Sequence, residues 1–266
     1  MQDKPNFVLV PDPDPKPAPE VSANAPVSLL TWLRTLIAPL TTALPHPWEP
    51  AAPTAAPTRP RLVFGVDATA SREPAWAVAR AVTDSLFAAL PGELDVALAV
   101  HGGSSLHTFT AFTANPATLR DRAAAISCRA GATRLLPMLS RALAEAGVRV
   151  VVYIGDVFEE SPARGGKLAD AMGTRGIRLI VLHDTADWLA RRDAEVFQDL
   201  ARRTGGCVLP FDATAPDRLR ELLAAVAVYA VGGTDLLERK RADLPGASLL
   251  LQHLGREDCL PGRVAD

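Results

Sequence analysis

The stretch RLVFGVDATAS, residues 61–71, decides the fold. It begins with a mostly apolar run of strand length that ends at Asp67, which is the pattern of a strand buried on both faces of a sheet. Thr69 and Ser71 follow at alternate positions, so one carboxylate and two hydroxyls can converge on one point. The stretch therefore predicts an α/β sheet with an oxygen-rich loop at the carboxyl end of its first strand.

From residue 61 to residue 230, strand-length apolar runs alternate with helical stretches. The strands expected at 94–100 and 106–112 are separated by a connection too short for a parallel crossover, so we predict a hairpin there. The other expected strands are 148–154, 177–182 and 207–211, and the expected helices are 74–90, 117–125, 134–146, 163–174, 192–203 and 216–230. We predict a doubly wound α/β domain with a mostly parallel six-stranded sheet and one antiparallel edge strand, of Rossmann-like architecture.

The chain on either side of this domain has a different composition. Residues 1–60 are rich in proline, which predicts a disordered N-terminal arm, and residues 27–44 carry apolar side chains at helical spacing. That segment predicts an amphipathic helix that docks on this domain or on a partner. It is shorter than the roughly 20 residues of a bilayer span, contains Arg34 and lacks the features of a secretory signal, so no membrane-spanning segment is expected. Residues 231–266 are predicted to form a C-terminal helical tail.

Charge and cysteine content exclude several classes of protein. With 28 basic and 30 acidic residues the net charge is −2, which gives no electrostatic basis for binding nucleic acid. The three cysteines form no Cys-x-x-Cys pair, which argues against a disulfide scaffold or a zinc ribbon. A reducing, cytoplasmic location is the simplest expectation.

Two later segments bring further oxygen atoms to the same edge of the predicted sheet. Thr133 lies in a turn before a helix, and Asp156 follows the β-branched strand 148–154. Ligands of open α/β sheets bind beyond the carboxyl ends of the strands, where the winding reverses direction. Hydroxyl and carboxylate oxygens suit Mg²⁺, for which Mn²⁺ should substitute. The candidate metal-site residues are Asp67, Thr69, Ser71, Thr133 and Asp156.

These five residues follow the order Asp-x-Ser/Thr-x-Ser, a distant Thr and a strand-end Asp. In this the sequence resembles the von Willebrand factor A (VWA) family and its metal-ion-dependent adhesion site (MIDAS), over residues 61–230. The resemblance implies that strands one and four lie side by side, that the three hydroxyls ligate Mg²⁺ directly, and that the two carboxylates hold bound waters. The chain departs from the family pattern at Val157, where Gly is common.

The resemblance also implies a function. An ion without a directly bound carboxylate keeps much of its charge, and an open coordination position would attract an acidic residue of a protein partner. Intracellular relatives are often adaptors, for example beside an ATPase or chaperone assembly. We therefore expect a cytoplasmic, non-enzymatic protein-binding module.

Other interpretations of these residues remain open. Asp67, Asp156 and Thr133 could each cap a helix or form a turn. As an alternative function, Asp67 could be the nucleophile of a Mg²⁺-dependent phosphohydrolase, although haloacid-dehalogenase-like phosphatases have Asp where this chain has Thr69. A third possibility is a structural domain with a vestigial metal site. Structural roles are expected for the remaining polar and sulfur-bearing side chains near strand ends and in loops: Glu159, Glu160, Asp184, His101, His183, Cys128 and Cys207.

Overall fold

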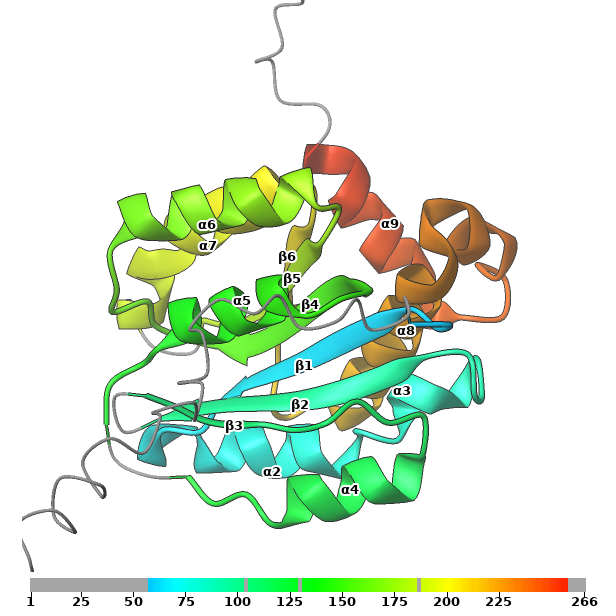
Figure 1. Ribbon diagram of the computed structural model, residues 1–266, viewed down its shortest axis with the longest axis horizontal. Coiled ribbons are helices and arrows are strands. Elements are labelled where there is room, and N and C mark those ends of the chain that lie inside the picture. Colours follow the sequence, from blue (N-terminus) through cyan, green and yellow to red (C-terminus); the bar gives the residue numbers. More distant parts are fainter. Residues whose placement is uncertain (1–56, 103–104, 129–130, 186–187, 258–266) are drawn as a thin grey trace, which may run out of the picture. The chain divides into compact units, whose positions relative to one another are not determined.

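The computed structural model describes residues 57–102, 105–128, 131–185 and 188–257 (Figure 1). The chain divides into two compact units, residues 1–53 and 54–266, and every described residue belongs to the second. The predicted Pro-rich arm and its helix at 27–44 lie outside the described residues, except for residues 57–60.

A six-stranded sheet in the order β3-β2-β1-β4-β5-β6 forms the centre of this unit. Strands β2 and β3 pair antiparallel as the predicted hairpin, and every other neighbouring pair is parallel. The prediction of a mostly parallel sheet with one antiparallel edge strand is confirmed. The strands are β1 (Arg61–Asp67), β2 (Asp95–Gly102), β3 (Ser105–Phe109), β4 (Val148–Gly155), β5 (Arg178–Asp184) and β6 (Cys207–Phe211).

Helices cover both faces of the sheet, with α5 and α6 on one side and α2 and α4 on the other (Figure 1). The helices are η1 (Ala70–Arg72), α2 (Glu73–Ala81), α3 (Ser85–Ala88), α4 (Pro116–Ala124), α5 (Leu135–Ala144), α6 (Pro162–Thr174), α7 (Trp188–Thr204), α8 (Pro216–Arg239) and α9 (Pro245–Glu257).

The side chains of β1 explain this layered arrangement. Leu62, Phe64 and Val66 are buried in the core that includes α2, α3, α8 and α9, whereas Val63 is buried in the core that includes α5 and α6. Successive residues of a strand point to opposite faces, so a strand that is apolar at every position needs a layer of helices on each side. Asp67 is the first charged residue after this run, at the carboxyl edge of the sheet.

The predicted helix over 74–90 is wrong in one respect, because the structure divides it into α2 and α3. The Thr83 hydroxyl donates to the Arg80 carbonyl at 3.1 Å, and the Ser85 hydroxyl likewise donates to the carbonyl three residues before it. Such side-chain bonds to the backbone compete with the hydrogen bonds of a continuous helix. The two hydroxyl residues therefore favour a turn over 82–84.

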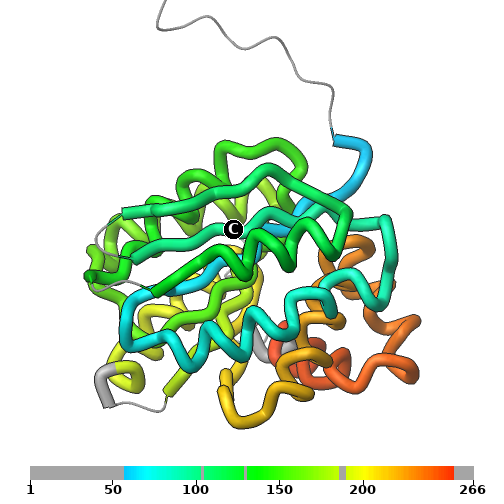
Figure 2. The backbone as a smooth tube through the Cα atoms, turned by 90° about the horizontal axis from the view of Figure 1, so that it is seen from below, coloured from blue at the N-terminus to red at the C-terminus, as the bar shows by residue number. Residues whose placement is uncertain are grey.

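The described part of the C-terminal segment is helical. Helix α8 continues past residue 230 to Arg239, with a kink at Gly233, whose φ of 65° suits glycine. Helix α9 packs against α8 and β6 (Figure 2, orange to red). Among the described residues, no helix combines the length and the apolar character that crossing a membrane requires.

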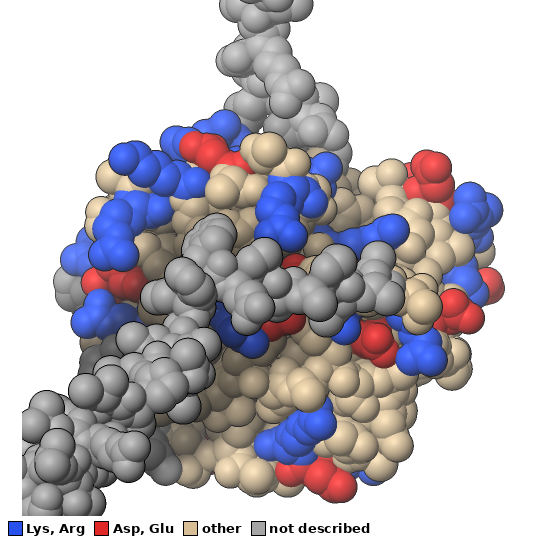
Figure 3. Space-filling view, viewed as in Figure 1, with Lys and Arg blue, Asp and Glu red and all other residues tan. Residues whose placement is uncertain are grey.

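Charged side chains of both signs lie together on the outer surface of α6 and α7 (Figure 3). Arg203 of α7 pairs with Asp199 on its own helix at 2.7 Å and with Asp170 of α6 at 3.0 Å. These pairs are largely exposed, so each stabilises the fold by no more than about 1 kcal/mol.

Candidate functional site

The loop after β1 arranges the first three candidate residues. The Asp67 carboxylate is almost fully buried, and its Oδ1 accepts the Thr69 backbone N–H at 2.9 Å. Aspartate closes turns in this way by bonding to the backbone two residues later. The Thr69 and Ser71 hydroxyl oxygens are then 3.3 Å apart. Because Thr69 is buried and Ser71 exposed, these oxygens extend from the interior of the domain to its surface.

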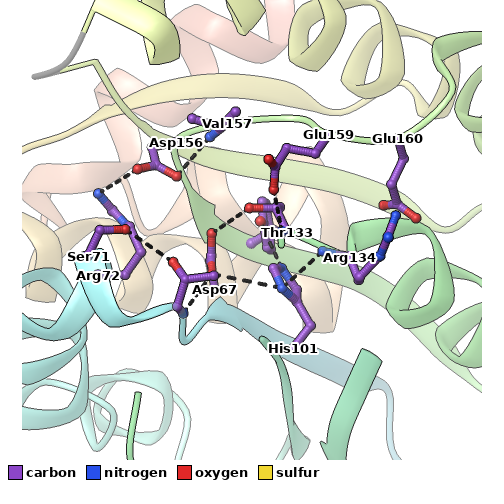
Figure 4. Close-up of polar contacts among 12 residues, drawn as sticks. Asp67, Ser71, Arg72, His101, Thr133, Arg134, Asp156, Val157, Glu159 and Glu160 are labelled. Atoms are coloured by element: carbon purple, nitrogen blue, oxygen red, sulfur yellow. Dashed lines mark hydrogen bonds and ion pairs between the residues drawn. The ribbon is translucent and has the colours of Figure 1, made fainter. Parts of the chain in front are cut away.

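Thr133 joins this group from the loop before α5. Its hydroxyl donates to Asp67 Oδ2 at 3.1 Å, across 66 residues of sequence. The alternative role of Thr133 as helix N-cap is not observed, since the N-cap of α5 is Arg134, whose own side chain makes no capping hydrogen bond. Figure 4 shows the Thr133 side chain pointing toward Asp67.

Asp156 lies at the end of the neighbouring strand. Strand β4 pairs with β1 in parallel, with Ile154 opposite Val66, as the resemblance implied. Asp156 Oδ1 accepts the Val157 backbone N–H at 2.8 Å, and among the described residues Asp156 makes no hydrogen bond to the other four candidates. Arg72 connects it to them, because the Arg72 backbone N–H donates to the Thr69 carbonyl at 2.9 Å and its Nη1 lies 3.4 Å from Asp156 Oδ2.

Both carboxylates are destabilised in their charged form. Burial raises the pKa of Asp67, although hydrogen bonds from Thr69 and Thr133 and the charge of Arg72 oppose the rise. Burial also raises the pKa of Asp156, where the Arg72 charge opposes and the Asp67 charge reinforces the rise. A cation placed between these carboxylates would relieve the cost of burying them.

His101, near the end of β2, is fully buried beside the site, a position that the sequence did not reveal. Its Nδ1 accepts the Arg134 backbone N–H at 3.3 Å and lies 3.9 Å from Asp67 Oδ1. The imidazole is neutral, because burial lowers its pKa to about 4, so the remaining nitrogen, Nε2, carries the proton and donates to the Tyr153 hydroxyl at 2.9 Å. No local signal in the sequence distinguishes this histidine from the others.

Glu159 and Glu160, for which structural roles were expected, accept backbone N–H groups near the site. Glu159 Oε2 accepts the backbone N–H of Thr133 at 2.6 Å, and Glu160 Oε2 accepts that of Leu136 at 2.7 Å. They satisfy N–H groups at and just before the start of α5, where the helix dipole favours negative charge. The loop after β4 is thereby tied to the loop that carries Thr133 (Figure 4).

The donor set determines what the site can hold. Within the described ranges no group of three or more His, Cys, Asp or Glu side chains is arranged to hold a metal ion. A cation here would depend on hydroxyl oxygens, water and at most two carboxylates, which suits Mg²⁺ or Mn²⁺ better than a metal that prefers softer ligands. The oxygen donors of the five predicted residues are of the chemical kind that such an ion prefers.

The same contacts bear on the hydrolase alternative. Both Asp67 oxygens accept hydrogen bonds, and the residue is only 1% exposed. A nucleophile must reach the atom that it attacks. This environment disfavours Asp67 as a covalent nucleophile.

No protein-family model and no curated protein sequence matches this chain. Solved structures do match its fold. A von Willebrand factor type A protein from Catenulispora acidiphila superposes with a TM-score of 0.54 at 15% identity, over 64% of this chain and 43% of that one. Proximal thread matrix protein 1 of the mussel byssus, solved with a zinc-occupied MIDAS motif, gives 0.51 at 12% identity over 64% and 46% of the two chains.

The pilus adhesin SpaC of Lactobacillus rhamnosus GG gives a TM-score of 0.51 at 12% identity, over 64% of this chain and 30% of the adhesin. The match thus spans less than half the length of each of these proteins. At such identities the likeness is one of fold, and it agrees with the sheet order and helix layers described above. The described domain has the fold of a von Willebrand factor A domain.

Proposed function

We propose that this chain is a non-catalytic, cytoplasmic adaptor that holds Mg²⁺ at a MIDAS-type site and binds an acidic residue of a protein partner. The observation that carries the proposal is the hydrogen-bonded group of Asp67, Thr69, Ser71 and Thr133 at the carboxyl end of β1, with Asp156 at the end of adjacent β4. Sequence segments far apart supply these oxygens to one edge of the sheet. The mussel protein of similar fold was solved with a zinc-occupied MIDAS motif, which supports the proposal of a divalent metal site.

Each residue has a distinct role in the proposed site. Thr69, Ser71 and Thr133 would ligate the ion directly, and Asp67 and Asp156 would hold its bound waters. Asp67 already fixes the loop through Thr69 and orients the Thr133 hydroxyl, so it organises two of the three direct ligands. When bound, the ion supplies a positive centre for a guest carboxylate. Ser71, the exposed member, is where a partner would approach.

Metal binding tests the proposal directly. We expect Mg²⁺ and Mn²⁺ to raise the thermal unfolding midpoint of the wild type, since an ion that binds only the folded state stabilises it by mass action. Asp67→Asn should abolish the shift. Asp212→Asn is a matched control, because Asp212 follows another parallel strand, β6, but its side chain hydrogen-bonds only to Thr214 among the described residues. An unchanged midpoint in the wild type would contradict metal binding and favour a vestigial site.

Partner binding needs a separate measurement. Bound Mn²⁺ with open coordination positions accelerates the relaxation of water protons, and acetate should reduce this effect if a carboxylate takes such a position. A protein partner captured in Mg²⁺ should be lost in chelator and with Asp67→Asn, and retained with Asp212→Asn. Binding that persists both in chelator and with Asp67→Asn would contradict metal-dependent recognition.

A further inference from the structure

Arg72 is a buried cation at the edge of the proposed metal site. It follows Ser71 directly, and its side chain is 8% exposed. Its Nη1 lies 2.8 Å from Asp184 Oδ2 and 3.4 Å from Asp156 Oδ2. Asp184 ends β5 and Asp156 follows the end of β4, so the guanidinium bridges the carboxyl ends of two adjacent strands. Arginine is rarely buried in this way unless it is paired.

Arg72 does not form a two-nitrogen pair with either carboxylate. A strong arginine–carboxylate pair uses two nitrogens against the two oxygens of one carboxylate. Here a single nitrogen serves two carboxylates, and Nη2 is buried with no hydrogen-bond partner among the described residues. The contact with Asp156 is also the longer of the two. Arg72 is thus anchored mainly on Asp184 and only loosely on Asp156.

The carboxylates at this edge carry more negative charge than one guanidinium balances, which favours binding of a second cation. Two carboxylates, those of Asp156 and Asp184, pair with one guanidinium, and the buried Asp67 carboxylate belongs to the adjoining group of oxygens. One arginine therefore balances part of the negative charge, and a divalent ion placed among the hydroxyls would share the Asp156 carboxylate with it.

We propose that Arg72 is a built-in competitor for Asp156 that sets the affinity of the site for divalent cations, with Asp184 holding the guanidinium partly away from Asp156. This inference rests on the proposed metal site. Arg72 acts as a positioning residue through Asp156 and repels the ion by its charge. The affinity for the divalent ion then depends on how strongly the guanidinium pairs with Asp184 and how strongly it pairs with Asp156.

Isothermal titration of Mn²⁺ and Mg²⁺ into the full chain tests this. Arg72→Gln should tighten binding by about tenfold or more, because a nearby positive charge is removed. Arg72→Lys, which keeps the charge, should stay much closer to the wild type. Arg192→Gln is the control for general charge, since Arg192 is 63% exposed and pairs with Asp193. Its effect should be small because solvent screens it.

A double-mutant cycle separates competition from simple addition of charges. Asp184→Asn should weaken binding by about tenfold in the wild type, since Arg72 then turns to Asp156. In the Arg72→Gln background the same substitution should cost much less. Equal costs in the two backgrounds would overturn the proposal, because independent charges act additively.

The outcomes distinguish this inference from the proposed function. If the wild type binds metal and Arg72→Gln binds no tighter, only the competition is overturned. If neither binds, both are overturned, and if only Arg72→Gln binds, competition is supported while metal-dependent recognition by the natural chain is not. Should Arg72→Gln unfold in chelator, metal-induced refolding followed by circular dichroism gives the affinity. Failure to refold at any Mn²⁺ concentration would count against the proposal.

Discussion

The buried hydrogen bond between His101 and Tyr153 allows a quantitative prediction. Both side chains are fully buried, and His101 Nε2 lies 2.9 Å from the Tyr153 hydroxyl. Tyr153→Phe keeps the ring and its packing on Phe197 but removes the acceptor of the Nε2 proton. A buried donor left without a partner costs about 1–3 kcal/mol. In a domain of this size, 1 kcal/mol lowers the unfolding midpoint by about 2–4 °C.

We therefore expect Tyr153→Phe to lower the free energy of unfolding by about 2 kcal/mol and the midpoint by about 4–8 °C. Urea and thermal unfolding, both in chelator so that metal binding does not contribute, measure the two quantities. Nitrogen NMR of the histidine ring gives an independent check, since it shows which nitrogen carries the proton. A loss below about 0.5 kcal/mol, or a proton on Nδ1, would refute the tautomer assigned from the Arg134 contact.

Three further predictions concern the pH dependence of stability, the packing of two glycines and the reactivity of a thiol. The pKa of His101 is about 4 in the folded protein, and its ordinary value is 6.5. Between these two pH values the unfolded chain binds a proton at His101 and the folded protein does not, so the free energy of unfolding falls as the pH drops from 6.5 toward 4. Urea unfolding should show about 2 kcal/mol of this loss between pH 7 and pH 5, and His101→Gln should lack it. Gly206→Ala should destabilise the fold by about 2 kcal/mol or more, because a Cβ there overlaps the Leu179 carbonyl, whereas Gly166→Ala, which has room, should be neutral or stabilising in thermal melts. Burial and a neighbouring carboxylate raise the pKa of the Cys128 thiol to about 12, so iodoacetamide at pH 8 should label it far more slowly in the folded than in the denatured protein, as peptide mass spectrometry would show.

The fold was predictable because its signals are local. The uninterrupted apolar run before Asp67 requires burial on both faces, and the short connection between 94–100 and 106–112 permits only a hairpin. The error at 74–90 has a local cause as well, because two hydroxyl residues bond back to the helix carbonyls there. The spacing of apolar residues, which was the basis of the helix prediction, contains no information about such side-chain hydrogen bonds.

The candidate site was predictable only in part. Strand ends and loop spacing point to Asp67 and Thr133, and the structure joins them by a hydrogen bond. The roles of Arg72, His101 and Glu159 depend on contacts across 26 to 112 residues of sequence, which no short motif records. Asp184 was expected to be structural, and its ion pair with Arg72 places it beside the site. Side-chain partners at such separations follow from the packed sheet and not from spacing.

The position of β1 has a consequence for synthesis of the chain. This strand lies between β2 and β4, and β2 is complete roughly 45 residues before β4 begins. At about 5–20 residues per second, a ribosome needs several seconds to make that connection. During this interval the backbone edge of β1 that later pairs with β4 has no partner strand. That edge can form hydrogen bonds with the same strand of another nascent chain. Crowded translation of this protein should therefore favour aggregation before β4 emerges, and a chaperone that shields residues 61–67 would act within that interval.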